Sequence, residues 1–348
     1  MKRFRIGLVG LGVAARQVHL PAYAQLSNLE VVGGVDPAVR DGALPFPVFG
    51  SPEQMIDKAR PDILAVLTPP ASHHALARIG LQAGCHVFCE KPLTPTLEEA
   101  DELCALSRQL GRVLVVNNQY RFMNIHQAAR RRIGRPEFGE LLFLSAEQTF
   151  YTTPATEAGW RGQDPERTCK EFGIHVLDLC RFFFGQEPLA VTARMPKPGA
   201  PHGPDLLNLI RLDFPGDRVA QLTLDRLCRG KHRYLRLRLD GSAGCIETRL
   251  GGGALFSAGF RGRTRRPYLE LELSLGGRAR LHHGERYQKI ASDPLNVFAG
   301  ATRRLLGAFL AALEGGGTPP CEAHDNRHSI ALMRAAYESS RRGETVTP

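Results

Sequence analysis

The sequence lacks an apolar run long enough to cross a membrane. A spanning helix needs about 20 consecutive apolar residues, and the 348-residue chain, 43% hydrophobic and 23% charged, contains no such stretch. The short apolar run in the N-terminal MKRFRIGLVGLG is rich in glycine and is followed by Arg16 and His19. We interpret it as part of the folded protein rather than as a signal peptide, and we expect no association with membranes.

The eight cysteines lack the spacing of a metal site or of a disulfide scaffold. None of them form a CxxC motif, and several lie in apolar runs, where a free cysteine behaves as a small hydrophobic residue. We therefore predict no metal site. The same pattern favours a reduced, cytoplasmic protein.

Acidic residues are fewer than basic ones. The chain has 35 Asp and Glu residues and 45 Lys and Arg residues, for a net charge of +10. A basic chain can indicate nucleic-acid binding. Here the arginines are dispersed, and the one local run, Arg130 to Arg132, lies in a helix-like segment whose solvated face explains it. With no nucleic-acid motif we expect no nucleic-acid partner, while anionic small molecules stay open as substrates.

The first third of the chain alternates short apolar runs with helix-like segments. The runs favour strands at 5–9, 29–35, 63–68, 86–89 and 113–116, and the segments favour helices at 13–26, 72–83 and 97–110. Such alternation predicts an α/β fold, with a doubly wound parallel sheet and helices on both faces. We expect this domain to span residues 1–120.

A glycine-rich turn follows the first of these strands. It has the form G-x-G-x-x-A, with a tight turn at its first glycine, close approach of a pyrophosphate at the second, and close packing of helix and strand at Ala15. Asp36 ends the second strand, where a carboxylate accepts hydrogen bonds from a ribose and repels a 2′-phosphate, which favours NAD over NADP. Arg40 lies near enough to leave NADP open. The candidate cofactor contacts here are Gly10, Gly12, Val13, Ala14 and Asp36.

The pattern changes after residue 120. Several runs alternate apolar and polar residues, as the strands of a half-buried sheet do; these runs are 141–150, 205–214, 218–224, 234–239 and 269–275. Residues 259–267 are expected to form a loop, and 297–314 and 326–341 to form helices. The pattern predicts a second, α+β domain over residues 121–348.

Motifs along the chain resemble those of one family, the Gfo/Idh/MocA oxidoreductases, which include relatives of glucose–fructose oxidoreductase and inositol dehydrogenase. In order they are GLVGLG, HLPAY, Asp36, TPPASH, AGCHVFCEKPLT, QYRF, GIHVLDL, DGSAGCIE and ESSRRGETV, and they cover essentially the whole chain. The resemblance implies an N-terminal Rossmann domain and a C-terminal α+β domain with a large, mostly antiparallel sheet. It also implies an NAD(P)-dependent reaction on a sugar, polyol or sugar derivative, and a homodimer or homotetramer formed through that sheet.

Lys91 is the first candidate catalytic residue. It follows the fourth predicted strand, at the carboxyl edge of the sheet where open α/β folds bind ligands, and a lysine there can donate a hydrogen bond to the reacting oxygen. The resemblance implies a cis peptide before Pro92. We expect Glu90 to be a structural or pairing carboxylate beside the cofactor.

His175 is the second candidate, and it matches the catalytic histidine of the family. In a helix, Glu171, His175 and Asp178 would share one face, and histidine is the usual acid or base near neutral pH. Glu171 is the third candidate catalytic residue, and it departs from the aspartate that the family commonly has at this position. Lys170 replaces a small or apolar residue and could bind an anionic group or pair with Glu171.

The other candidates follow from position or from the resemblance. Thr68, Pro69 and His73 are expected to support the cofactor loop, and Asn117 to lie near the cofactor. Arg121 is either a pocket residue or a structural contact between domains, and Trp160 either a sugar platform or a core residue. The candidate substrate contacts are Lys91, Arg121, Tyr151, Trp160, Arg161, Lys170, Glu171 and His175.

These observations favour an NAD(P)-dependent oxidoreductase acting on a secondary alcohol or carbonyl. Two alternatives remain at this point. One is a redox-neutral lyase or glycosidase of the same fold that uses NAD transiently; the other is a dinucleotide-sensing regulator, which the presence of both Lys91 and His175 disfavours.

Overall fold

The structure is a computed structural model that describes residues 2–151, 164–198, 203–230, 234–261, 266–284 and 286–348. The chain divides into two compact units. The first contains residues 1–122 and 298–331, and the second contains residues 123–297 and 332–348. The single domain boundary expected after residue 120 differs from this division because residues 298–331 belong to the first unit. The extents of the functional domains stay a prediction.

The first unit is built on a six-stranded parallel sheet with the order β3-β2-β1-β4-β5-β6. Its strands are β1 (Phe4–Val9), β2 (Leu29–Val35), β3 (Val48–Phe49), β4 (Ile63–Val66), β5 (His86–Cys89) and β6 (Leu114–Val116). Five of the six were expected, and the parallel α/β architecture predicted from the sequence is confirmed.

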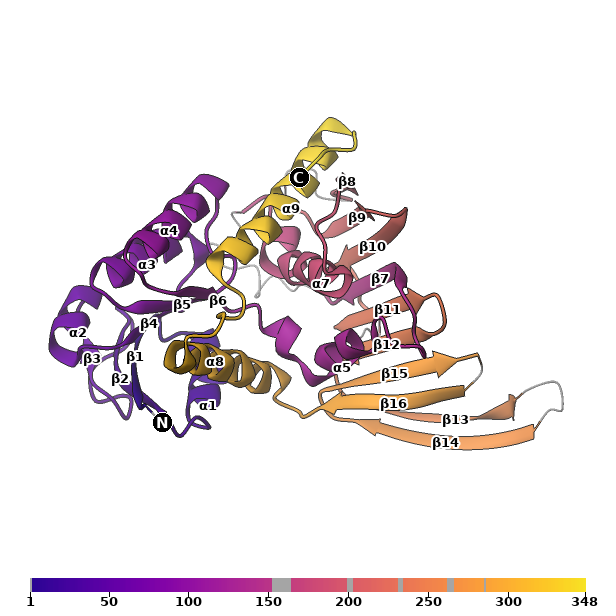
Figure 1. Cartoon of the computed structure of the whole chain (residues 1–348), viewed down its shortest axis with the longest axis horizontal. Helices are drawn as coiled ribbons and strands as arrows, with labels where there is room; N and C mark the ends of the chain where they lie inside the picture. Colours follow the sequence, from indigo (N-terminus) through magenta and orange to yellow (C-terminus); the bar gives the residue numbers. More distant parts are fainter. Residues whose placement is uncertain (1, 152–163, 199–202, 231–233, 262–265, 285) are drawn as a thin grey trace. The chain divides into compact units, whose positions relative to one another are not determined.

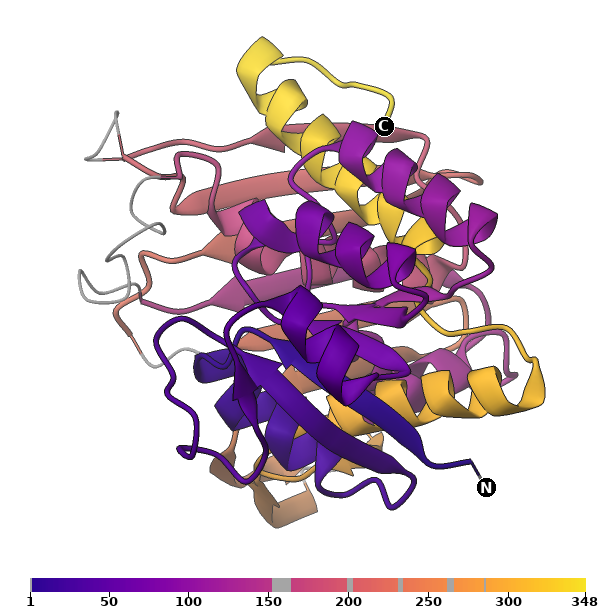
Figure 2. The same cartoon turned by 90° about the vertical axis from the view of Figure 1, so that its left-hand side faces the viewer.

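Helices lie on both faces of this sheet (Figure 1). One face carries α2 (Pro52–Ala59), α3 (His73–Gln82) and α4 (Leu97–Gln109). On the other face α1 (Leu20–Tyr23) and most of α8 (Val297–Gly315) share an apolar core with the strands, which includes Leu8, Phe88 and Phe309. Figure 2 shows α8, in amber, beside the indigo strands, although nearly two hundred residues separate it from β6.

Two local features of the first unit differ from expectation. The helix expected over 13–26 is present over 13–23, but it contains a π-helical turn, η1 (Ala15–His19), and ends with the short α1. Helix α2 was not expected, although Ser51 caps it by accepting a hydrogen bond from Gln54 N at 3.2 Å, and Pro52 occupies its first turn. Both residues are common helix-start signals.

The second unit is built on an eight-stranded sheet with the order β16-β15-β12-β11-β7-β10-β9-β8. Its strands are β7 (Leu141–Thr149), β8 (Ala190–Arg194), β9 (Leu207–Phe214), β10 (Arg218–Asp225), β11 (Leu235–Gly241), β12 (Cys245–Leu250), β15 (Gly277–His283) and β16 (Arg286–Asp293). Only the β7–β10 pairing is parallel among those described, so the mostly antiparallel sheet is confirmed.

Helices of the second unit lie along this sheet, as Figure 1 shows for α5 (Asn124–Arg132) and α7 (Ile174–Phe184). A second π-helical turn, η5 (Cys169–Gly173), leads directly into α7. The last helix, α9 (Ala323–Arg342), was expected over 326–341, and its residues are divided between the two units.

The prediction of a loop over residues 259–267 is wrong, because strands occupy both ends of this segment. Strands β13 (Gly253–Arg261) and β14 (Arg266–Ser274) form a separate two-stranded ribbon that includes residues 259–261 and 266–267. The error arose because the Gly and Arg residues of this segment suggested a loop, whereas the strand pattern predicted over 269–275 begins earlier, at Arg266.

Among the described residues, no helix is both long and apolar enough to span a bilayer. Within the same residues, no group of three or more His, Cys, Asp and Glu side chains is arranged to hold a metal ion. All eight cysteines are free thiols.

Candidate active site

The glycine turn after β1 has the geometry of a phosphate cradle. Gly10 has φ 95°, and a Cβ there would come within 2.8 Å of the Leu67 backbone, so only glycine fits. At Gly12, by contrast, nothing described lies within 4 Å of the position a Cβ would take. The first glycine is therefore required by the fold, while the second leaves space for a ligand to approach the backbone. Val13 and Ala14, which follow it, are exposed.

This turn borders a cavity of about 490 Å³ in the first unit. The cavity lies at the carboxyl ends of β1, β2 and β4, and its lining comprises Val9, Gly10, Gly12, Val35, Asp36, Pro37, Pro52, Leu67, Thr68, Pro69, Ser72 and Leu76. Open α/β sheets bind nucleotides at this edge. The volume, the open space at Gly12 and the carboxylate of Asp36 all fit a dinucleotide.

Asp36 is held in the wall of this cavity by the turn itself. Its Oδ2 accepts a hydrogen bond from Leu11 N at 2.8 Å, and its Oδ1 accepts one from Ala38 N at 2.9 Å. Each carboxylate oxygen has capacity for a second hydrogen bond. The side chain is thus fixed in orientation and is still able to accept hydrogen bonds from ribose hydroxyls.

His73 connects the cavity wall to the turn that follows Lys91. Its ring nitrogens lie 2.7 Å from Thr68 O and 2.8 Å from Pro92 O. Burial lowers the pKa of His73, while the hydrogen bonds to the two carbonyls act in the opposite direction. The adjacent turn is closed by Ser72 Oγ, which donates to Thr68 Oγ1 at 2.7 Å.

Glu90 occupies the centre of a buried polar network at the end of β5. Its Oε1 lies 2.7 Å from His19 Nε2 and accepts a hydrogen bond from Asn117 Nδ2 at 2.7 Å, and its Oε2 accepts one from Lys91 N at 3.2 Å. His19 Nδ1 in turn lies 3.0 Å from the hydroxyl of Tyr23. Burial raises the pKa of Glu90, but His19, the charge of Lys91 and the hydrogen bond from Asn117 outweigh it and lower the pKa to about 2.

Glu90 and Asn117 were predicted to contact the cofactor. In the structure the Asn117 amide donates to Glu90, and Glu90 contacts His19 and the Lys91 backbone, so the cofactor contacts of Glu90 and Asn117 stay predictions. His19 was noticed in the HLPAY motif but was not assigned a role. Its partner could not be found from sequence, because Glu90 lies 71 residues further along the chain.

Lys91 begins the turn after β5 and is half-buried. The Lys91–Pro92 peptide is cis, as expected from the resemblance. Arg121, also in the first unit, forms an ion pair with Asp325 at 2.7 Å. This contact gives Arg121 a structural partner within its own unit.

In the second unit, His175 lies in the first turn of α7 and is 4% exposed. Glu171 lies in the π-helical turn η5, which leads directly into α7, and its sharing a face with His175 stays a prediction. Glu171 Oε2 accepts a hydrogen bond from Arg167 Nε at 2.9 Å, and Arg167 is 2% exposed. Asp178 lies 3.6 Å from Arg181, which also forms an ion pair with Glu187 at 2.6 Å.

Lys170 does not form an ion pair with Glu171 in the described contacts. Its ammonium donates to both carboxylate oxygens of Asp164, at 2.8 and 3.1 Å, and the two side chains are about a fifth to a quarter exposed. The anionic group to which Lys170 binds in this structure is therefore part of the chain itself.

Two buried charged residues near η5 were missed by the sequence analysis. The guanidinium of Arg226 stacks on the rings of Phe172 and Phe150, 4.8 and 5.2 Å from their centroids, and burial lowers its pKa to about 10. Asp205 accepts hydrogen bonds from Thr168 N at 3.0 Å and from the Tyr337 hydroxyl at 3.1 Å. Neither residue belongs to a recognisable motif, so the sequence carried no signal for them.

The remaining candidates lie beyond the end of β7. Tyr151 pairs with Leu227 through an isolated bridge, and Arg229 lies over its ring at 4.1 Å. Trp160 and Arg161 lie outside the described residues, so their predicted contacts with substrate stay predictions.

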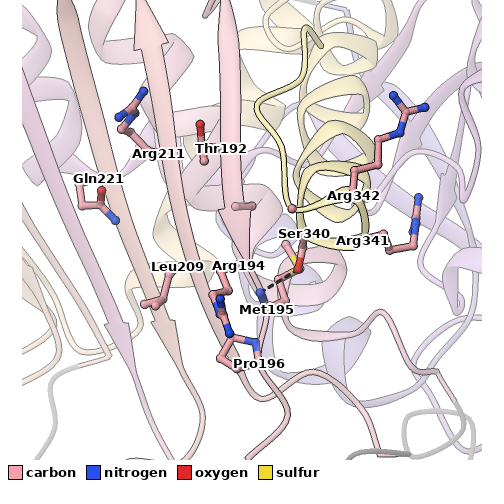
Figure 3. Close-up of a pocket in the computed structure, with 12 residues that line it drawn as sticks. Thr192, Arg194, Met195, Pro196, Leu209, Arg211, Gln221, Ser340, Arg341 and Arg342 are labelled. Carbon is pink, nitrogen blue, oxygen red and sulfur yellow. Dashed lines mark hydrogen bonds between the residues drawn. The ribbon is translucent and has the colours of Figure 1, made fainter.

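An arginine-lined groove of about 690 Å³ lies in the second unit, between β8, β9 and the end of α9 (Figure 3). Of its arginines, Arg211, Arg341 and Arg342 already have carboxylate partners in Asp213, Glu166 and Glu338. Figure 3 shows Arg341 and Arg342 on α9, apart from Arg194 and Arg211 on the strands. Because these cations do not converge, we assign the groove no ligand.

Comparison with known proteins identifies the family. A family model described as an oxidoreductase family with an NAD-binding Rossmann fold matches residues 4–118, and the GFO/IDH/MocA C-terminal domain model matches residues 126–247. The chain belongs to the Gfo/Idh/MocA family. It is an enzyme of the oxidoreductase class with an NAD-binding Rossmann domain.

Curated members of this family match over nearly the whole chain. D-apiose dehydrogenase of Paraburkholderia graminis is 26% identical over 99% of this chain and 90% of its own length. The 1,5-anhydro-D-fructose reductase of Ensifer adhaerens is 26% identical over 98% of both chains.

Solved structures of the family share the fold. An oxidoreductase from Agrobacterium radiobacter, in complex with NAD+, L-tartaric acid and magnesium, superposes with a TM-score of 0.81 at 18% identity, over 99% of this chain and 98% of that chain. The WlbA dehydrogenase of Bordetella pertussis, in complex with NADH and UDP-GlcNAcA, has a TM-score of 0.78 at 19% identity, over 100% and 99% of the two chains.

Proposed function

We propose that this oxidoreductase transfers hydride to or from a secondary alcohol or carbonyl of a sugar, polyol or sugar derivative. The observation that carries the proposal is the position of His73, whose two ring nitrogens lie within hydrogen-bonding distance of two backbone carbonyls. These contacts tie Thr68, in the wall of the dinucleotide cavity, to Pro92, which directly follows Lys91. Lys91, a candidate proton donor, is thereby attached to the same edge of the parallel sheet as the glycine turn that forms the cofactor cradle. Relatives named as D-apiose dehydrogenase and 1,5-anhydro-D-fructose reductase support the substrate class.

The cradle at Gly10 and Gly12 holds the pyrophosphate, and Asp36 accepts hydrogen bonds from a ribose. A carboxylate at that position favours NAD over NADP. Hydride transfer is the chemistry that a bound nicotinamide cofactor supplies. Side chains of the protein carry out all the remaining steps.

Lys91 donates a hydrogen bond to the substrate oxygen whose proton is lost or gained. His175 accepts or returns that proton, since imidazole changes its protonation state near neutral pH. Glu171 orients this region through Arg167. Arg121, Tyr151, Trp160, Arg161 and Lys170 are the proposed contacts that select the substrate.

The test is a panel of aldoses, polyols, uronates and nucleotide sugars, followed by NADH absorbance. With a substrate in hand, we expect Lys91→Ala and His175→Ala each to reduce turnover by about 10²-fold or more. Lys58→Ala removes an exposed lysine from α2 in the same unit and is the matched control. If Lys91→Ala retained full turnover, Lys91 would not have the role proposed here. Product formed without any net absorbance change would point to the redox-neutral reaction instead.

We further propose a homodimer or homotetramer formed through the eight-stranded sheet. The support is the exposure of two large apolar side chains on its strands, Leu142 in β7 and Leu209 in β9, each more than a third exposed. Light scattering of the purified chain tests this, and a monomer at micromolar concentration would refute it. The cytoplasmic location is likewise a proposal, supported by the eight free thiols.

A further inference from the structure

Gln148, near the end of β7, is a buried amide whose hydrogen-bonding capacity is unused. Its side chain is 1% exposed, and neither Oε1 nor Nε2 has a hydrogen-bond partner within the described part of the chain. Folding rarely leaves a buried polar group in this state, because the group loses its bonds to water without replacement. A glutamine kept under these conditions needs an explanation that the folded chain alone does not supply.

The sheet register places this amide beneath the helix that carries His175. Gln148 pairs with Leu224 of β10, so the two side chains share a face of the sheet. Gly173 lies against Leu224 so closely that a Cβ on Gly173 would collide with its side chain. Gly173 is the last residue of η5, two residues before His175. Gln148 is therefore next to Leu224, the residue against which the turn that precedes His175 packs.

A second incompletely satisfied amide lies on the other side of Leu224. Asn208 of β9 also pairs with Leu224 and is fully buried. Its Nδ2 donates to Asp205 at 2.8 Å, while its Oδ1 has no hydrogen-bond partner among the residues that the structure describes. Two buried amides with unused hydrogen-bonding capacity thus lie in one row of this sheet face, next to the candidate reaction centre.

We propose that Gln148 binds a hydroxyl group of the substrate. The inference rests on the function proposed above. A carboxamide donates through Nε2 and accepts through Oε1, and a hydroxyl both donates and accepts, so the two groups are complementary. Sugars and polyols carry several such hydroxyls. A site that hydrogen-bonds a substrate hydroxyl in a buried place discriminates strongly against analogues that lack it.

The test compares wild type with Gln148→Met, which removes the amide and keeps the unbranched shape. In the absence of ligand we expect the variant to be more stable, with Tm raised by about 2–4 °C, since an unsatisfied buried group is lost. We expect its affinity for the substrate found in the panel to fall about tenfold. Its affinity for NADH, measured by fluorescence titration, is expected to stay unchanged.

Gln221→Met is the matched control, because Gln221 is half-buried in β10 of the same sheet. We expect it to change neither Tm nor substrate affinity. Gln148→Leu carries the same test if the Met variant does not fold.

A lower Tm for Gln148→Met would show that the amide has a permanent partner, such as an ordered water, and would overturn the inference. A higher Tm with unchanged substrate affinity would overturn it as well. If wild type binds NADH but none of the sugars or polyols, the proposed substrate class fails, and the inference fails with it. The Tm comparison needs no substrate, so it separates these failures.

Discussion

The Glu90 network makes a prediction about stability and pH that can be worked from the structure. The carboxylate is held by His19, Asn117 and the Lys91 backbone amide, and its pKa is lowered from 4.5 to about 2. Each unit of pKa difference between the folded and unfolded states corresponds to about 1.4 kcal/mol. Ionised Glu90 therefore stabilises the fold by about 3 kcal/mol at pH 7.

The sign follows from the depressed pKa. The stabilisation is fully present above about pH 4.5, where the unfolded carboxylate is also ionised, and it is lost as pH falls towards 2. Glu90→Gln removes the charge and keeps the shape. We expect the variant to be less stable than wild type by about 3 kcal/mol at pH 7 and by about 1 kcal/mol at pH 3.

The measurement is urea unfolding of both full-length proteins, followed by circular dichroism, at several pH values between 7 and 3. Glu102→Gln is the control, since Glu102 also contacts a histidine, His74, but is half exposed. An exposed pair of this kind contributes less than about 1 kcal/mol. If the gap between wild type and Glu90→Gln were the same at pH 7 and pH 3, the network would not hold Glu90 as an ion, and the reasoning would be wrong.

Two further predictions concern the cofactor cradle. We expect Gly10→Ala to destabilise the protein by about 2 kcal/mol, because its positive φ and the Leu67 backbone exclude a side chain. Gly12→Ala should leave unfolding within about 0.5 kcal/mol of wild type yet weaken NADH binding about tenfold, measured by fluorescence titration; equal effects at the two glycines would contradict the assignment. Asp36→Asn keeps one acceptor and removes the charge, so the preference for NADH over NADPH should fall about tenfold, and an unchanged ratio of the two affinities would exclude Asp36 as its source.

The part of the fold that was predictable came from short-range signals. Strands β1, β2, β4, β5 and β6 are short apolar runs followed within two residues by glycine or a polar residue, and each appears where the pattern placed it. Helix α2 was not predicted, although Ser51 and Pro52 are signals for the start of a helix.

The placement of α8 could not be predicted in the same way. The sequence shows that residues 297–314 form a helix with an apolar side, but an apolar side is complementary to any sheet face. Only the packing of Leu306 and Phe309 against strands of the first unit assigns it. Long-range choices of this kind depend on the whole fold, and a local pattern does not encode them.

The candidate site likewise contains some residues that the sequence predicts and some that it does not. Gly10, Asp36, Lys91 and His175 stand in recognisable motifs. Arg226 has no motif, and its aromatic partners became visible only in the structure. Gln148 is an intermediate case, because it occupies the inward position of an alternating strand, after Leu144 and Ala146, where an apolar residue is expected. A polar residue in an inward register position is a signal that sequence analysis could have used.

The two π-helical turns bear on the least familiar residue of the site. Such turns are rare and frequently occur at functional sites, and here one contains His19 while the other contains Glu171. In η5 the Glu171 carboxylate reaches back to Arg167, a buried cation that needs a partner. A glutamate can make this contact from a backbone position where the shorter aspartate would fall about one bond length short. The departure at residue 171 is then explained by the pairing of Arg167, and the proton transfer proposed for His175 does not depend on it.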